Sequence, residues 1–329
     1  MPVKHLKYTW LLPAFLLMMA ACKDDKYALP TAKNGLHNDC IKRTLGPNLV
    51  GQPIEFAYAM AILPGQGKIV SAQVEASIAG APQTWLQNNS FYTNGSGDDV
   101  GIPVGDPSVN EGAVTKVNFT KDTSAATLRY YYYIPEAARG KTVRFTFNAK
   151  SSNGETVSYA MGPYTISKMD MKLDIPVKDA ANCFISIADL TAYNSTDAAA
   201  SPDKIDLVYL YRSIPNISFN HSLVSPGADK QYLPGVSLPP NANRSTKISK
   251  VWNLQDFNLA RLKYGVYIDD LDFEKLNISN APNYAINMKE EAGAWVETAD
   301  GKYRAYIFMN KVNNGSKSAV ISIKRYTLK

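Results

Sequence analysis

Few residues of this sequence have both the type and the spacing that catalysis requires. Apart from His5, the histidines are His37 and His221. Ser222 and Ser225 lie close to His221, but the chain has no Gly-x-Ser-x-Gly, His-Glu-x-x-His, phosphate-binding glycine loop or dinucleotide motif. Hydrogen bonding within a loop therefore explains these serines better than nucleophilic catalysis does. The sequence predicts a protein that is not an enzyme.

The densest acidic cluster consists of Asp269, Asp270, Asp272 and Glu274. Calcium prefers carboxylate ligands, so Asp269, Asp270 and Asp272 are candidate ligands of a calcium ion. If residues 266–272 are extended, Asp270 and Asp272 share one face and Asp269 points to the other. A solvated strand end explains the same residues without a metal. No other cofactor is predicted, and glycoside hydrolysis stays open because it needs only two suitably spaced carboxylates.

Aromatic side chains on loops are a second kind of residue that could bind a ligand, because their rings stack on sugars. The segment from Gly80 to Val114 contains Trp85, Phe91 and Tyr92 but no clear period. A loop of this length without structure of its own is often functional or mobile. The alternative is that its aromatic side chains close one end of a β-sandwich.

A further candidate cleft lies in the second half of the chain. The span from Ser213 to Lys247 is rich in proline, and His221, Tyr232 and the nearby Trp252 could form a cleft wall around it. These three residues complete the predicted ligand-binding set with Trp85 and Tyr92.

The first half of the chain alternates apolar and polar residues with a period of two, as half-buried strands do. The alternating segments are residues 54–62, 70–78, 128–134, 143–147 and 159–166. Within one of them, Tyr130 and Tyr132 face one side and Tyr131 and Tyr133 the other, so one pair belongs to the core. The pattern predicts an all-β fold with an immunoglobulin-like sandwich over residues 40–168, without the cysteine pair and central tryptophan of antibody domains.

Residues 169–176 are interpreted as a boundary, after which strands are interrupted by long irregular segments. Strands are predicted at residues 183–188, 205–211, 266–268, 304–310 and 319–326, the last two joined as a hairpin. Asn253 can cap a helix that runs to Tyr264 and ends at Gly265. Residues 169–329 are therefore predicted to form a β-rich domain with a short helical insertion, whose topology the pattern leaves open.

Composition agrees with a globular protein, since 45% of the 329 residues are hydrophobic and 19% are charged. The formal net charge is +6, and no block of Lys or Arg suggests a nucleic-acid partner. Cys40 and Cys183 could form a disulfide in an oxidising compartment or remain as buried thiols. Their spacing does not resemble a zinc or redox motif.

The first 21 residues combine a basic start with an apolar run that ends in Ala20-Ala21 before Cys22. This arrangement resembles a bacterial lipoprotein signal peptide, with Met19 where leucine is usual. The resemblance implies that residues 1–21 are removed and that Cys22 carries the lipid that holds the protein on a membrane. Residues 22–39 then form a flexible tether.

Lys23, Asp24 and Asp25 resemble the signal that sends Bacteroidetes lipoproteins to the outer face of the outer membrane. The resemblance implies a lipid-anchored protein that faces the outside of the cell. The alternative is an ordinary polar tether on an anchor that faces the periplasm.

Four segments of the second half carry a family resemblance: residues 193–199, 204–209, 221–229 and 267–270. They resemble an uncharacterised Bacteroidetes family of two-domain surface lipoproteins, a domain of unknown function, over essentially the whole mature chain. This organisation is also loosely similar to the accessory glycan-binding lipoproteins of starch-utilisation-type systems. The resemblance implies no catalytic residues.

Together these features predict a surface-exposed outer-membrane lipoprotein that binds carbohydrate or another surface polymer without catalysis. One alternative is a structural or protein-interaction component of a cell-surface complex, with an outer-membrane protein as partner. The second is a glycoside hydrolase-like enzyme. The identity of the ligand, the oligomeric state and any dependence on calcium stay open.

Overall fold

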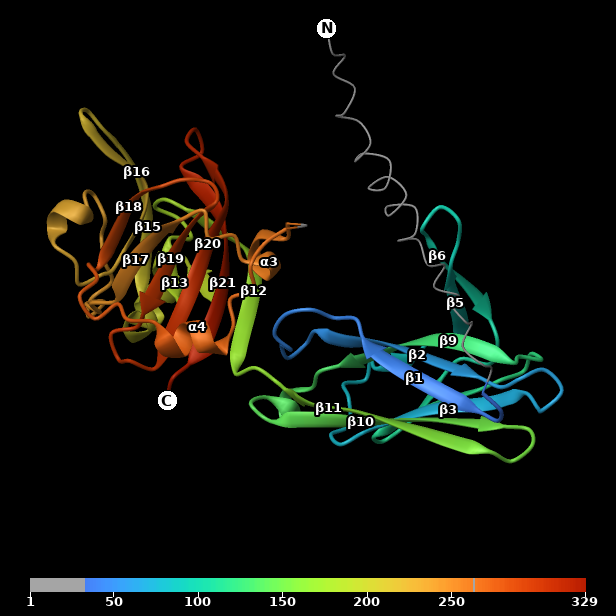
Figure 1. Ribbon diagram of the computed structural model, residues 1–329. Helices are drawn as coiled ribbons and strands as arrows, with labels where there is room; N and C mark the ends of the chain where they lie inside the picture. The colour runs from blue at the N-terminus through green and yellow to red at the C-terminus, as the bar shows by residue number, and fades with distance from the viewer. Residues whose placement is uncertain (1–32, 263) are drawn as a thin grey trace, which may run out of the picture.

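The computed structural model describes residues 33–262 and 264–329 and consists mainly of β-strands, as predicted (Figure 1). Two β-domains follow one another along the chain. The signal peptide over residues 1–21, the lipidated Cys22 and the export signal of Lys23, Asp24 and Asp25 all lie outside the described residues. In the described ranges, every helix is too short or too polar to cross a membrane.

The first domain is a sandwich of two antiparallel sheets, with strand orders β1-β2-β9-β4 and β11-β10-β3-β8-β7. The first sheet contains β1 (His37–Lys42), β2 (Pro53–Ala61), β4 (Trp85–Leu86) and β9 (Ala125–Tyr133). The second contains β3 (Ile69–Ala76), β7 (Val109–Glu111), β8 (Val114–Asn118), β10 (Thr142–Ser151) and β11 (Thr156–Thr165). A separate hairpin of β5 (Asn89–Thr93) and β6 (Asp99–Pro103) stands away from the sandwich (Figure 1).

The alternation of apolar and polar residues along the strands places the apolar side chains in this core. Phe56 and Tyr58 of β2 are fully buried and lie 5.3 and 5.1 Å, between ring centroids, from Phe147 of the opposite sheet. Tyr130 and Tyr132 of β9 are also buried in this core. Their neighbours Tyr131 and Tyr133 are only partly buried, which confirms the predicted division of the four tyrosines.

Two expectations for the first domain need correction. The segment from Gly80 to Val114 is not one irregular loop, because it contains the four short strands β4 to β7. In addition, β1 begins at His37 and pairs with β2, so ordered structure starts within the predicted tether of residues 22–39. Cys40 lies on β1, and both Cys40 and Cys183 are buried free thiols rather than a disulfide.

The second domain is also a sandwich, with strand orders β12-β21-β20-β19-β17 and β14-β13-β15-β16-β18. The strands of its first sheet are β12 (Met169–Lys178), β17 (Lys247–Trp252), β19 (Ala292–Glu297), β20 (Tyr303–Asn313) and β21 (Ser318–Thr327). Those of its second sheet are β13 (Phe184–Ser186), β14 (Thr191–Tyr193), β15 (Leu207–Ile214), β16 (Ile217–Val224) and β18 (Tyr284–Met288). The described helices of this domain are α2 (Ser195–Ala200), α3 (Phe257–Ala260) and α4 (Asp270–Lys275), with single 3-10 turns η2 (Pro202–Lys204) and η3 (Lys230–Tyr232). The 3-10 turn η1 (Glu136–Ala138) belongs to the first domain.

Strand β20 shows how the layers of this domain are arranged. Ile307 and Met309 point into the core between the two sheets. Tyr306 and Phe308, on the opposite face, pack in a second cluster with Leu259 of α3 and with α4. The strand is therefore buried on both faces, because the segment that carries α3 and α4 covers the outside of its sheet (Figure 1).

That covering segment differs most from its predicted structure. The predicted helix from Asn253 to Tyr264 is reduced to the single turn of α3, capped by Asp256 rather than Asn253. Asn253 adopts a φ of +56°, and Arg261 ends the turn with the same positive φ. Gly265 allows the chain to return, since a Cβ there would lie 2.8 Å from the carbonyl oxygen of Gln255.

Residues 266–272 are not extended either. The predicted strand at residues 266–268 is reduced to one isolated bridge between Val266 and Asp256, and a helix, α4, starts at Asp270. Asp269 caps this helix, and its carboxylate accepts hydrogen bonds from the backbone N–H groups of Leu271 and Asp272. Residues 169–176 are not a linker, because strand β12 begins at Met169 as the first strand of the second domain.

The two domains are joined by packing and by polar contacts. Leu49 of the first domain, only 2% exposed, is buried in the cluster that contains Leu259 and Tyr306 of the second. Arg139 forms an ion pair with Asp170 at 2.7 Å. This combination of an inserted leucine and an ion pair holds the second domain against one end of the first.

Candidate binding groove

The candidate site is built on the outer face of the sheet β1-β2-β9. The strand register places Ala59 of β2 between Asp39 of β1 and Thr127 of β9. Ala61 lies in the next outward-facing row, between His37 and Ala125. Small side chains on the middle strand, flanked by longer ones on β1, leave a hollow along β2.

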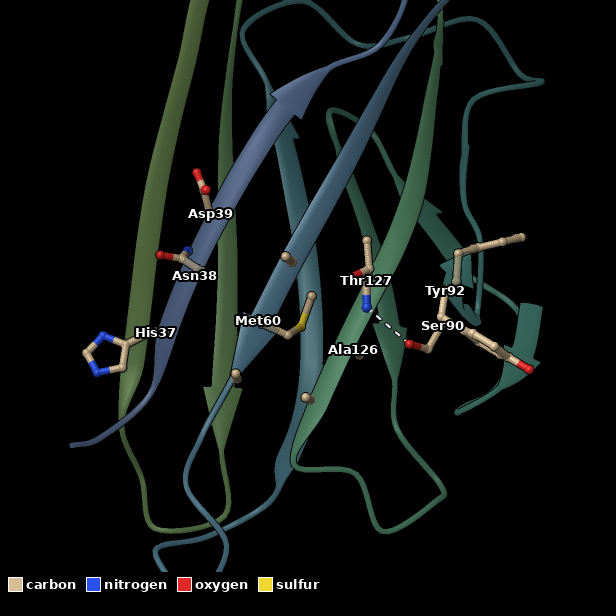
Figure 2. Close-up of a pocket in the computed structure, with 12 residues that line it drawn as sticks. His37, Asn38, Asp39, Met60, Ser90, Tyr92, Ala126 and Thr127 are labelled. Carbon is tan, nitrogen blue, oxygen red and sulfur yellow. Dashed lines mark hydrogen bonds between the residues drawn. The ribbon is translucent and has the colours of Figure 1, made fainter. Parts of the chain in front are cut away.

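The hairpin β5–β6 turns this hollow into a groove of about 480 Å³. Figure 2 shows His37 and Asp39 on one side and Ser90 and Tyr92 on the other, with Thr127 between them. Phe91 of the same hairpin also lines the groove. The site thus has an apolar floor, an aromatic wall and a polar wall, a combination that suits ligands with both apolar and hydroxyl-bearing faces.

Contacts of Ser90 and Phe91 with strand β9 help to hold the hairpin in this position. The hydroxyl oxygen of Ser90 accepts a hydrogen bond from the backbone N–H of Thr127 at 3.1 Å (Figure 2). The guanidinium of Arg129 lies 5.5 Å from the ring centroid of Phe91, within the range of a cation–π interaction. The aromatic wall is therefore tied to the strand next to the floor.

A cluster of four alternating charges lies beyond the floor. Arg129 is bonded to Asp99 at 2.8 Å, and Arg43 to Glu55 at 2.9 Å. Arg43 also approaches Asp99 to 3.6 Å. The hydrogen bond from Arg129 lowers the pKa of the Asp99 carboxyl, so this carboxylate stays ionised and anchors the start of β6.

The polar wall on β1 has its own hydrogen bonds. The carboxylate of Asp39 accepts a hydrogen bond from the backbone N–H of Cys40 at 2.8 Å. A hydrogen bond with Asp39 also raises the pKa of the Tyr159 hydroxyl. His37 shares a hydrogen bond of 2.6 Å between its Nε2 and the carbonyl oxygen of Asn34. Among the described residues that line the groove, Asp39 is the only carboxylate.

Of the predicted ligand-binding residues, Tyr92 lines this groove and is 52% exposed. Trp85 does not line it. Its ring stacks on Tyr131 further along the same face of the sheet, with 5.4 Å between ring centroids, and remains 43% exposed. The two aromatic residues thus lie on one side of the first domain but not in one cavity.

The structure gives His221, Tyr232 and Trp252 separate partners and does not bring them together around one cavity. His221 is buried, with its Nδ1 2.6 Å from the Tyr209 hydroxyl, and burial lowers its pKa. Tyr232 stacks on Tyr284 at 3.6 Å between centroids. Trp252 is exposed at the end of β17, where Lys250 Nζ lies 4.2 Å from its ring centroid.

The three calcium candidates have separate partners within the protein. Asp269 caps α4, while Asp272 accepts a hydrogen bond from the backbone N–H of Asp269. Asp270 accepts hydrogen bonds from the Ser167 hydroxyl and from the backbone N–H of Lys168. The described parts of the chain contain no group of three or more acidic, histidine or cysteine residues arranged to hold a metal. The geometry of these carboxylates therefore explains their spacing without an ion.

The serines near His221 also have structural partners. The Ser222 hydroxyl donates to the carbonyl oxygen of Phe219, and the Ser225 hydroxyl donates to that of Arg244. The acceptors of both hydroxyl groups are therefore backbone carbonyl oxygens and not the His221 ring. Both serines therefore act as hydrogen-bonding groups, as the sequence favoured, but Ser222 lies on strand β16 rather than in a loop.

Sequence reasoning missed the groove itself. The alternation in β2 identifies Ala59 and Ala61 as the face opposite the core, but it does not reveal that this face is hollow. The sequence signal that could have indicated the hollow is the set of small alanine side chains on one face of β2. The hairpin that closes the groove was hidden because glycine and aspartate in the turn between Tyr92 and Asp99 break the period.

The fold and the groove define a two-domain β-sandwich protein with an open groove on its first domain. Family models of two domains of unknown function match the chain, DUF4466 over residues 33–166 and DUF8576 over residues 167–328. The crystal structure of a DUF4466 family protein from Parabacteroides merdae is 47% identical, covers 90% of this chain and 99% of its own, and has a TM-score of 0.84. The chain belongs to the DUF4466 family.

This membership agrees with the predicted resemblance to an uncharacterised Bacteroidetes family. No curated protein matches the chain. A cohesin module of a Clostridium perfringens family 33 glycoside hydrolase is 13% identical and covers 40% of this chain and 96% of its own, with a TM-score of 0.24. The Actinomyces fimbrial adhesin FimA is 11% identical and covers 89% and 96%, with a TM-score of 0.29. Scores this low support no argument.

Proposed function

We propose that this protein is a non-catalytic lipoprotein of the outer membrane that faces the outside of the cell and binds carbohydrate or another surface polymer. The observation that carries the proposal is the groove over β2. Its floor of Ala59 and Ala61 is shallow enough for a chain-like ligand, and the exposed ring of Tyr92 can stack on a sugar. The polar wall of His37 and Asp39 supplies hydrogen-bonding groups.

The proposed attachment rests on the sequence before the first domain. Acylation of Cys22 would hold the protein on the membrane, and Lys23, Asp24 and Asp25 would direct it outward. Replacing Cys22 with serine is expected to abolish incorporation of a labelled fatty acid. Replacing the three following residues with alanine is expected to protect the protein from protease added to whole cells, while lipidation persists.

Filling the groove tests the binding function. The soluble form from Lys23 to Lys329 is analysed by affinity electrophoresis in gels that contain one polysaccharide each. Ala59→Trp places a large ring on the floor between Asp39 and Thr127 without changing the core face of β2. We expect retention by the polysaccharide that binds the wild type to fall at least about tenfold, equivalent to about 1.4 kcal/mol of binding free energy.

The matched control is Ala160→Trp. Ala160 is exposed on β11, in the other sheet of the same domain, and does not line the groove. Retention of this variant should equal that of the wild type. Retention of A59W at the wild-type level would show that the ligand binds elsewhere. If no gel retains the wild type, carbohydrate binding is refuted and a protein partner becomes the better explanation.

A further inference from the structure

A second cavity, of about 400 Å³, lies where the two domains meet. Its walls come from the first domain between Arg43 and Glu55, from Tyr131 of β9, and from Phe257, Asn258 and Tyr267 of the second domain. We call this cavity the junction cleft. Because both domains contribute, its shape depends on the joint that Leu49 and Arg139 stabilise.

Two residues of the junction cleft have acceptor atoms without a partner. The side-chain oxygens Oδ1 of Asn48 and of Asn258 are buried, and neither has a hydrogen-bond partner among the described residues. The Asn48 amide is oriented by its Nδ2, which donates to the carbonyl oxygen of Thr165 at 2.8 Å. Buried acceptors of this kind are rare in native proteins, so a water molecule or a ligand hydroxyl from outside the chain is the expected donor.

The other walls point to the chemistry of that donor. The rings of Phe257 and Tyr267 lie 4.8 Å apart, and Tyr131 carries the stacked Trp85. The charges of Arg43 and Glu55 are paired at 2.9 Å, so the pair adds no net charge to the cleft. Aromatic rings beside unpartnered oxygen acceptors suit an uncharged ring that bears hydroxyl groups, which is a neutral sugar residue.

The junction cleft and the groove lie along the same face of the sheet. In the strand register, Glu55 and Tyr131 form the row that is two outward-facing rows beyond Ala59 and Thr127. At a rise of about 3.4 Å per residue, the distance along β2 from Ala59 to Glu55 is ~14 Å, which is the length of a short oligosaccharide. The ionic cluster of Arg43, Glu55, Asp99 and Arg129 extends from the wall of the junction cleft, where Arg43 and Glu55 lie, toward the groove.

We propose that the junction cleft is a second subsite, specific for a neutral sugar residue of the same polysaccharide chain that occupies the groove. This inference rests on the proposed function, because it extends the bound chain across the ionic cluster. Asn48 and Asn258 accept hydrogen bonds from sugar hydroxyls at one end, while Tyr92 stacks on a sugar at the other.

The test compares polymers with short fragments of them. The probes are the neutral polysaccharides amylopectin, xyloglucan, galactomannan and mannan, the acidic polygalacturonate, and disaccharides from each neutral polymer. Asn258→Leu removes one acceptor and keeps the size of the side chain. We expect it to weaken binding of the neutral polymer roughly tenfold, the loss typical of an unpaired polar contact, while binding of its disaccharide in the groove is unchanged.

Asn182→Leu is the matched control, since Asn182 is exposed in the turn before β13 and lines neither cavity. It should bind polymer and disaccharide like the wild type, and the unfolding temperatures of both variants identify any folding defect. If A59W loses the polymer and N258L retains it fully, the junction subsite is refuted and the proposed function stands. Preference for polygalacturonate over every neutral polymer would also overturn the subsite.

A second experiment tests whether a sugar occupies the junction cleft without relying on polymer binding. Crystals of the wild type are soaked with the neutral disaccharides at millimolar concentration. Density for a sugar ring within hydrogen-bonding distance of Asn48 and Asn258 supports the subsite. An empty junction cleft beside an occupied groove refutes it. An empty cleft together with an empty groove refutes both proposals.

Discussion

The role of a polar residue in this chain depends on the groups around it more than on its residue type. His221 is the clearest case, because a histidine beside two serines resembles a catalytic group in the sequence. In the structure its Nδ1 shares a hydrogen bond with Tyr209, and its Nε2 lies 2.8 Å from the side-chain oxygen of Asn314 in the β20–β21 turn. Burial lowers the pKa of His221, so the neutral ring serves as a bridge between the two sheets.

This lowered pKa has a consequence for stability. Below pH ~6.5 the unfolded chain takes up a proton at His221 and the folded chain resists it, so the free energy of unfolding falls as the pH is lowered through that range. We expect His221→Gln to lose this contribution. The stability advantage of the wild type over the variant should therefore be larger at neutral pH than at mildly acidic pH, as measured by urea denaturation.

His37→Gln is the control for this experiment, because His37 is exposed on the wall of the groove. Its substitution should change the free energy of unfolding by no more than about 0.5 kcal/mol, as is usual at the surface. An equal pH dependence for the His221 and His37 variants would contradict the assignment of a buried, neutral His221.

Among the elements, α4 is the one whose start the structure explains most fully. Asp269 and Asp272 form a capping box, in which each side chain accepts a hydrogen bond from the backbone N–H of the other residue. We expect Asp269→Ala to lower the free energy of unfolding by about 1 kcal/mol, the usual cost of losing an N-cap. Chemical denaturation followed by circular dichroism measures the change.

Asp203→Ala is the matched control for the cap. Asp203 is exposed in the 3-10 turn η2 and has no capping role. Its effect should stay within about 0.5 kcal/mol, as is usual at the surface. A loss for D269A no larger than that for D203A would mean that the cap does not stabilise α4.

Strands were predictable where burial on one face leaves a period of two, as in β2, β3, β9 and β10. The helix predicted from Asn253 to Tyr264 failed for a tertiary reason. Asp256 is needed in an extended conformation, because its buried carboxylate pairs with Lys324 at 2.6 Å and caps α3. The spacing of apolar residues near Asp256 cannot indicate this pairing, because Lys324 lies 68 residues further along the chain.

The candidate site was predictable only in part, for a similar reason. Tyr92 was recognised as an aromatic residue outside the regular strands, and it does line the groove. The alanine floor and the junction cleft arise from pairings between segments distant in the chain. Asn48 and Asn258 in particular line one cleft only because the two domains pack together.

For the whole molecule, the joint between the domains depends on Leu49. It is 2% exposed, whereas Leu45 in the same segment is 73% exposed. We expect Leu49→Ala to lower the free energy of unfolding by about 2 to 5 kcal/mol, as for other buried leucines. Small-angle scattering should also detect a wider range of domain orientations in this variant.

Leu45→Ala supplies the comparison from the same loop, and its effect should stay within about 0.5 kcal/mol. If the two leucine variants lose the same stability and scatter alike, Leu49 does not hold the domains together.

The two free thiols give each domain its own chemical reporter. Cys40 lies in the first core and Cys183 in the second, and burial raises their pKa values to about 12 and about 11. A soluble form that starts at Lys23 contains no other cysteine. An alkylating reagent can therefore react with each thiol only when its own domain opens. The two labelling rates then measure the opening of each sandwich separately within one molecule.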